Sequence, residues 1–177
     1  VEAMRNRIET MSLAEPLRSV VLVALMEAAD RVDSTCGVQM AYVKKWSARS
    51  FKPLQLRLPD ILPGAGRADC ADAEALAAEI TSDLVYLDPP YNQHSYLSNY
   101  HIWETLVRWD RPETYGVAQK RIDCKTRKSA FNSKRKHREA FERTIAALDV
   151  PMLLVSFSNE AFMTRIELEA ILGARGP

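Results

Sequence analysis

The eight residues 84–91, LVYLDPPY, decide the fold of this chain. Their first half, Leu84–Leu87, is a short apolar run with β-branched and aromatic members, which is typical of a buried strand. The two prolines that follow end the strand, because proline supplies no N–H for a sheet. Ligands in open α/β sheets bind at the ends of strands. We therefore expect a central strand that leads into a functional loop at residues 88–91.

Two further segments favour an α/β fold. Residues 134–148 predict a helix, with its buried stripe at Ala140, Phe141, Thr144, Ile145 and Leu148. A second apolar run, Met152–Val155, predicts another buried strand. The first third predicts helices, with Ser12 as the N-cap of the second one.

The residues at 88–91 suit methyl transfer to an amino nitrogen. The exocyclic amine of adenine is a poor nucleophile, because its lone pair is delocalised into the ring. The Asp88 carboxylate and the Pro89 carbonyl would each accept one N–H and stabilise the charge that develops on the nitrogen. Pro90 stiffens the turn, and Tyr91 offers a flat face on which a flipped base can stack. The alternative is an ordinary turn, since Asp and Pro are common turn residues.

Several blocks around this turn recur in a family order. They are DLVYLDPPYNQHSY at 83–96, NYH at 99–101, ET at 104–105, SAFNSK at 129–134, AFE at 140–142 and SFSNE at 156–160. In these blocks the chain resembles the D12 class of adenine-N6 DNA methyltransferases, in the branch typified by type IIS modification methylases. The likeness is clear over residues 69–165 and loose over the first sixty-odd residues.

The resemblance implies a partial Rossmann-like class I methyltransferase fold, with S-adenosylmethionine as the cofactor and a helical N-terminal part. Asp88, Pro89, Pro90 and Tyr91 match the catalytic motif of the family. Asp72 lies where these enzymes have an acidic residue that binds the adenine amino group of the cofactor. Asp69 is the rival for that role, and no metal is implied.

One feature of the family is missing. A strand that ends in a Phe-x-Gly-x-Gly-like turn should precede the catalytic loop, because its glycines let the backbone approach the methionine part of the cofactor. The clustered glycines here, Gly64 and Gly66, follow no strand-like run and are typical of a flexible loop. Since the sequence also starts at Val1 without a methionine, we expect a fragment.

We expect residues 1–177 to form one partial methyltransferase domain. Its first part, residues 1–66, would be mostly helical and a possible DNA-recognition region, and residues 67–177 would be the catalytic α/β part. Residues 37–58 mix aromatic side chains with lysines and arginines. This mixture fits contact with DNA, but it equally fits a helix and loop that pack their aromatic side chains inward.

The formal net charge is only +1, but it is unevenly distributed. Residues 119–138 contain nine basic residues and one acidic residue, so this stretch carries +8 and the remainder −7. A basic segment on an acidic body indicates phosphate contact, although a solvated helix face also explains such runs. The predicted DNA-binding residues are Arg127, Lys128, Lys134, Arg135 and Lys136.

Composition narrows the class of protein. The longest apolar run, residues 20–26, is much shorter than the roughly 20 residues of a membrane span. Cys36, Cys70 and Cys124 are widely spaced, with no second ligand near, which predicts reduced thiols and no metal. No signal peptide is recognisable. We expect a cytoplasmic, DNA-associated prokaryotic protein without a membrane partner.

The sequence thus predicts site-specific adenine-N6 methylation of double-stranded DNA with S-adenosylmethionine. A role in a restriction–modification system would make a restriction endonuclease its cognate partner. Two alternatives remain: a catalytically incomplete fragment that only binds DNA, or methylation of another amino nitrogen, such as cytosine N4 or RNA guanine. Near the turn, His94 and His101 are expected to hydrogen-bond within the loop or contact DNA rather than act as bases.

Overall fold

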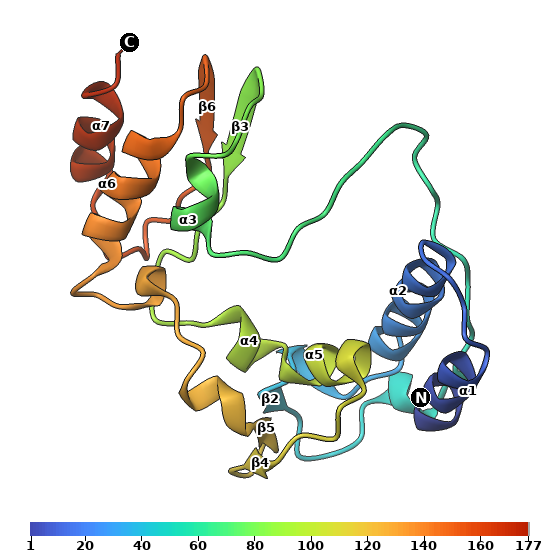
Figure 1. Cartoon of the computed structure of the whole chain (residues 1–177). Coiled ribbons are helices and arrows are strands. Elements are labelled where there is room, and N and C mark those ends of the chain that lie inside the picture. The colour runs from blue at the N-terminus through green and yellow to red at the C-terminus, as the bar shows by residue number, and fades with distance from the viewer. Residues whose placement is uncertain (177) are drawn as a thin grey trace. The chain divides into compact units, whose positions relative to one another are not determined.

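The computed structural model describes residues 1–176 and divides them into two compact units (Figure 1). Unit 1 comprises Val1–Ala65 and Leu97–Thr126, and unit 2 comprises Gly66–Tyr96 and the residues from Arg127 onward. The first change of unit along the chain lies between Ala65 and Gly66, and residues 97–126 return to unit 1.

Three helices make the core of unit 1. They are α1 (Glu2–Thr10), α2 (Leu17–Asp30) and α5 (His101–Arg108), which meet through Ile8, Leu22, Leu25 and Leu106. The prediction that Ser12 caps the second helix is wrong. The Ser12 N–H is bonded to the Glu9 carbonyl at the end of α1, and Pro16 takes the N-cap position.

The rest of unit 1 is short strands and turns. It contains the hairpin β1 (Thr35–Val38) and β2 (Ala41–Tyr42), the 3-10 turn η1 (Ala48–Phe51), the hairpin β4 (Thr114–Tyr115) and β5 (Lys120–Arg121), and the 3-10 turn η2 (Ile122–Lys125). The α-helical part of residues 1–66 therefore ends at Asp30. Pro53, Pro59 and Pro63 disfavour a helix in the following segment, because proline supplies no N–H and clashes with the preceding turn.

Long-range hydrogen bonds explain why residues 97–126 belong to unit 1. The buried Arg5 donates through Nε to the Leu106 carbonyl at 2.7 Å. The Gln39 N–H donates to the Asn99 carbonyl at 2.8 Å. Both bonds join residues that are far apart in the sequence, so no local pattern reveals them. The short helix α4 (Tyr96–Asn99) spans the point where the chain passes from unit 2 to unit 1.

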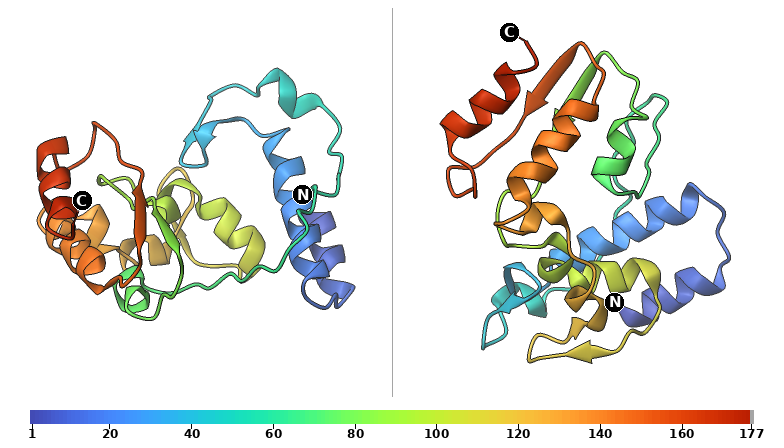
Figure 2. Two further views of the ribbon diagram at one scale, coloured as in Figure 1. Left: turned by 90° about the horizontal axis from the view of Figure 1, so that it is seen from above. Right: turned by 60° about the vertical axis from the view of Figure 1, so that its left-hand side comes forward.

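Unit 2 is built on a parallel pair of strands. They are β3 (Leu84–Leu87) and β6 (Met152–Val155), in register from Leu84 opposite Met152 to Leu87 opposite Val155. Both strands have the predicted bounds. The helices of this unit are α3 (Ala73–Ala77), α6 (His137–Ala147) and α7 (Arg165–Gly173), with the 3-10 turn η3 (Ala130–Asn132). Figure 2 shows α6 and α7 on the same side of the strand pair.

The predicted helix at 134–148 begins three residues later, at His137. Its expected stripe is confirmed: Ala140, Phe141, Thr144, Ile145 and Leu148 are all buried. The later start follows from a turn in which the Lys136 N–H donates to the Ser133 carbonyl. The basic residues at 134–136 therefore lie in the segment that leads into α6.

Only one face of the strand pair is covered within residues 1–176. Leu87, Leu153 and Val155 pack against the helices. The side chains on the other face, which are Leu84, Tyr86, Met152 and Leu154, are between 48% and 61% exposed. The strands are thus half-buried rather than fully buried as predicted, and the sheet is one-sided. No helix in the described residues is long and apolar enough to cross a membrane.

Candidate active site

The turn at residues 88–91 lies where both parallel strands end. The Ser156 N–H, just after β6, donates to the Leu87 carbonyl at 2.8 Å, and the Phe162 N–H donates to the Tyr91 carbonyl at 2.9 Å. The segment after β6 therefore holds the turn at its beginning and at its end.

A side chain holds the residues just beyond the turn. Asn132 donates through Nδ2 to the Asn92 carbonyl at 2.9 Å and to the His94 carbonyl at 3.1 Å. Asn132 belongs to the SAFNSK block at 129–134, for which the sequence suggested no role. The sequence shows only that an asparagine lies in this block, and residue type alone does not predict a hydrogen bond to a residue forty positions away.

The two predicted acceptors have no competing donor. Within residues 1–176, neither the exposed Asp88 carboxylate nor the Pro89 carbonyl accepts a hydrogen bond. Prolines at 89 and 90 contribute no N–H to the turn. The turn therefore presents acceptors without donors, as an amino group requires.

The ring of Tyr91 lies beside an aromatic cluster. Its centroid is 6.2 Å from that of Phe157, which in turn lies 6.0 Å from Phe141 and 5.8 Å from His137. His137 is fully buried: its Nδ1 is 2.8 Å from the Phe131 carbonyl, and its Nε2 has no partner within residues 1–176. This cluster supports Tyr91, and sequence reasoning missed it.

A cavity of about 400 Å³ joins the turn to the start of α3. Its lining includes Asp88, Pro89 and Pro90 from the turn and Asp72 from α3, with Phe131 as part of its wall. Asp72 caps α3 through Oδ1, which accepts the N–H groups of residues 74 and 75 at 3.0 and 3.3 Å. Its Oδ2 makes no hydrogen bond in the described part of the chain.

Of the two acidic residues expected near the cofactor, only Asp72 lines this cavity. Asp69 is exposed and pairs with Arg67, at 2.8 Å between Oδ2 and Nε. The pair lies just before α3, and Asp69 is not part of the cavity wall.

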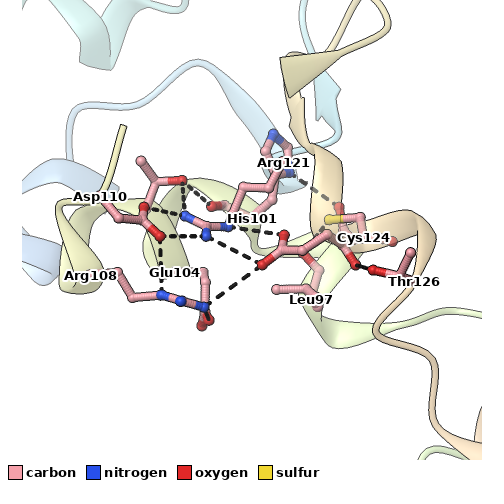
Figure 3. Close-up of polar contacts among 11 residues, drawn as sticks. Leu97, His101, Glu104, Arg108, Asp110, Arg121, Cys124 and Thr126 are labelled. Atoms are coloured by element: carbon pink, nitrogen blue, oxygen red, sulfur yellow. Dashed lines mark hydrogen bonds and ion pairs between the residues drawn. The ribbon is translucent and has the colours of Figure 1, made fainter. Parts of the chain in front are cut away.

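Eight of the nine basic residues at 119–138, all except the half-buried Lys120, divide into two groups. Arg121 is only 2% exposed and makes two hydrogen bonds of 2.7 Å to the Asp110 carboxylate, with Asp123 at 3.2 Å (Figure 3). Lys125 lies 4.4 Å from the Tyr115 ring, and Arg138 pairs with Glu142 at 2.9 Å. These cations are engaged within the protein.

The second group is the one predicted to bind DNA. Arg127, Lys128, Lys134, Arg135 and Lys136 are all exposed on either side of η3. Within residues 1–176 no ion pair is formed by Lys128, Lys134, Arg135 or Lys136. In the sequence they flank Asn132, which contacts the loop after the turn at residues 88–91.

The pairing of Arg121 has an electrostatic consequence in unit 1. Its hydrogen bond to Asp110 holds the pKa of that carboxyl below its ordinary value and raises the pKa of Arg121. His101, fully buried in the same region, lies with Nε2 2.9 Å from the Ala118 carbonyl and Nδ1 3.2 Å from the Ser98 carbonyl. His101 was expected to hydrogen-bond within the loop: its contact with Ser98 does so, whereas its contact with Ala118 reaches beyond the loop.

These features agree with a comparison of the whole chain with known families. The model of the D12 class of N6 adenine-specific DNA methyltransferases matches residues 1–152. This chain belongs to that family. The match starts at residue 1, so the family likeness of this D12 methyltransferase also covers the first sixty residues, where it looked loose. The family implies a DNA substrate and a methyl donor, generally S-adenosylmethionine.

Its relatives include type II methyltransferases and modification methylases. The chain is 35% identical to the type II methyltransferase M.FokI of Planomicrobium okeanokoites, over 97% of this chain and 27% of that protein. It is 29% identical to the modification methylase LlaI of Lactococcus lactis subsp. lactis, over 95% of this chain and 28% of that protein. The chain thus spans about a quarter of the length of these two relatives. No solved structure matches it.

Proposed function

We propose that this D12 methyltransferase transfers a methyl group from S-adenosylmethionine to N6 of adenine at a specific site in double-stranded DNA. The observation that carries the proposal is the pair of acceptors, the Asp88 carboxylate and the Pro89 carbonyl, which accept no hydrogen bond within residues 1–176 and line one cavity.

In this proposal each acceptor binds one hydrogen of the adenine amino group. The nitrogen then becomes more tetrahedral, and the positive charge that forms on it lies beside the Asp88 carboxylate. The methylated amine is acidic, so its proton leaves without a strong base, and Asp88 is exposed enough to pass it to water. Tyr91, supported by Phe157, stacks on the extruded base.

The cavity would hold one end of the cofactor in this proposal. S-adenosylmethionine supplies the methyl group, which is activated on a sulfonium. The unpaired Oδ2 of Asp72 would accept the adenine amino group of the cofactor, with Phe131 as an apolar wall. The methionine end has no glycine turn within residues 1–176: a Cβ added at Gly64 or Gly66 would meet no atom within 4 Å, so neither marks a close approach.

For the DNA we propose phosphate contacts with Arg127, Lys128, Lys134, Arg135 and Lys136. We further propose that β3 and β6 belong to a Rossmann-like class I sheet, because the two strands are parallel and all-parallel sheets occur almost only in α/β folds. The modification methylases among the relatives support a restriction–modification role in a prokaryotic cytoplasm, with a restriction endonuclease as partner.

The test is to incubate the protein with duplex DNA and methyl-tritiated cofactor and to digest the DNA to nucleosides. Label is expected in N6-methyladenosine. Asp88→Ala should reduce it at least about 100-fold, because one acceptor of the transition-state charge is lost. Asp83→Ala removes an exposed carboxylate outside the cavity and should change nothing. Label in cytosine, or in guanine when RNA replaces the DNA in a parallel reaction, would overturn the choice of adenine.

A second candidate is a chain that binds DNA without catalysing transfer. The absence of a glycine cradle among the described residues favours it. Calorimetric titration with S-adenosylmethionine separates the two candidates. Micromolar binding that weakens in Asp72→Ala would exclude the second candidate, whereas DNA binding without any cofactor heat would support it.

A further inference from the structure

Unit 1 has a surface of its own that combines exposed aromatic rings with cations. Residues 43–59 contain five basic residues and no acidic residue. Within this segment Trp46 is 76% exposed and Phe51 is 78% exposed. The reading in which these aromatic side chains pack inward is therefore wrong. We name residues 44–52 the aromatic–basic turn.

The aromatic–basic turn is fixed to the residues before β1. The Ser47 and Ser50 hydroxyls both donate to the Asp33 carbonyl, at 3.0 and 3.1 Å, and the Ser47 N–H donates to the Ser34 hydroxyl at 2.7 Å. Arg49 donates to the same Asp33 carbonyl at 2.8 Å and pairs with the Asp33 carboxylate. Arg49 is thus a brace, and η1 is held by hydrogen bonds rather than by burial of Trp46 and Phe51.

A braced turn that presents two large aromatic side chains to water is suited to binding. Exposure of large apolar rings to water is unfavourable, and a segment whose backbone is already fixed loses less conformational freedom when a partner covers its rings. The charges select the partner. Lys44, Lys45 and Lys52 are exposed and form no ion pair in the described residues. The centre of a protein interface is depleted in lysine, whereas rings among unpaired cations are typical of nucleic-acid binding.

We propose that Trp46 and Phe51 stack on bases of the DNA, while Lys44, Lys45 and Lys52 bind the adjacent phosphates. The identity of the nucleic acid rests on the proposed function. Base faces are covered in an intact duplex, so this stacking requires DNA that is locally opened, as it is when a base is extruded. The surface adds a second DNA contact, in unit 1, to the one proposed for residues 127–136 in unit 2.

The test measures the fluorescence anisotropy of two labelled duplexes, one fully paired and one with a single unpaired adenine. The wild type should bind the second duplex more tightly. The double variant Trp46→Ala, Phe51→Ala should lose about tenfold or more of that affinity, as expected for two lost stacking contacts, with an unchanged salt dependence. Trp46→Phe keeps a ring and should retain most of the affinity.

Charge is tested separately. Lys44→Glu with Lys45→Glu should weaken binding to both duplexes and reduce the slope of log affinity against log salt, because phosphate contacts are lost. Arg7→Glu on α1 is a matched control for charge reversal, and Val117→Ala, 85% exposed at the β4–β5 turn, is a matched control for an exposed apolar side chain. Neither control should change the affinity or the slope.

Affinities of the Trp46→Ala, Phe51→Ala variant equal to wild type on both duplexes would overturn the proposal. The proposal would also be overturned if sedimentation showed that the wild type self-associates and the variant does not, because the rings would then bind a second copy of the chain. The proposed function is judged independently, by label in N6-methyladenosine and by its loss in Asp88→Ala.

Discussion

The two units bury different polar side chains. Both have an apolar core. Unit 1 also buries the cations Arg5 and Arg121, each of which is paired with a carboxylate. In unit 2 a fully buried polar side chain is the His137 imidazole, and the apolar core covers one face of β3 and β6 while the other face is exposed. Loss of a charge partner should therefore matter most in unit 1, and loss of apolar volume in unit 2 should matter on the covered face of the strands.

The difference also separates the two proposed DNA contacts. In unit 2 the turn at residues 88–91 is positioned by backbone hydrogen bonds at the ends of two strands, and the loop after it by Asn132. In unit 1 the aromatic–basic turn is positioned by side chains bonded to Asp33 and Ser34. Substitutions in one unit should leave the other unit's contact intact.

The largest effect on stability is expected from Asp110→Ala in unit 1. It leaves the buried Arg121 with Asp123 as its remaining carboxylate and the Thr105 hydroxyl as a neutral acceptor, and breaking such a buried pair should cost about 3 kcal/mol of unfolding free energy. Denaturant unfolding followed by tryptophan fluorescence measures this, since Trp46, Trp103 and Trp109 all lie in unit 1. Glu104→Ala, which removes the partly exposed pair with Arg108, should cost only about 0.5 kcal/mol. Equal costs would contradict the account of unit 1.

Next comes a matched pair in unit 2. Leu153→Ala removes volume from the covered face of β6 and should cost about 2 kcal/mol. Leu154→Ala lies on the exposed face and should change stability by less than about 0.5 kcal/mol. Hydrogen exchange of the β3 and β6 amides measures both. Similar protection in the two variants would mean that the strands are not one-sided.

A smaller effect is expected at Asn132. Asn132→Ala removes two hydrogen bonds to the loop after the catalytic turn, worth about 1 kcal/mol each. We expect faster hydrogen exchange at residues 92–96 and slower methyl transfer, with the exchange of β3 unchanged. Asn132→Asp has the same shape but directs a carboxylate at two carbonyl oxygens, so it should be at least as harmful. Normal hydrogen exchange at residues 92–96 in the Asn132→Asp variant would show that Asn132 does not hold this loop.

The smallest effect is the dependence of stability on pH that Asp110 contributes in unit 1. The pKa of Asp110 is lowered in the folded protein by its hydrogen bond to Arg121. Its stabilising contribution is therefore complete above the unfolded-state value of about 3.9 and is lost as the pH falls toward the lower folded-state pKa. Unfolding monitored by tryptophan fluorescence should show the wild type losing stability below about pH 4. Asp110→Asn should give a flatter curve, and parallel curves would contradict the assignment.

Local patterns predicted the parts of the fold that depend on neighbouring residues. The two strands have their expected bounds, and the buried stripe of α6 is as expected, because both follow from the spacing of apolar side chains. The acceptors at Asp88 and Pro89 also follow from residue type alone.

The remaining features depend on distant partners. Arg121 is buried although it lies in a basic run, because the Asp110 carboxylate pairs with it. Residues 97–126 belong to unit 1 partly because Arg5, about a hundred residues away, donates to the Leu106 carbonyl. The sequence could not predict which face of the strands is exposed, since Leu153 and Leu154 are identical residues on opposite faces. Periodicity shows that side chains alternate but not which side is covered.

The central claim is that the Asp88 and Pro89 acceptors bind the amino group that becomes methylated. A structure of the protein with duplex DNA containing its target adenine tests it most directly. We predict an extruded adenine stacked on Tyr91, with its amino nitrogen about 3 Å from both the Asp88 carboxylate and the Pro89 carbonyl. An adenine that remains in the helix, or an extruded base whose amino group faces other residues, would contradict the account.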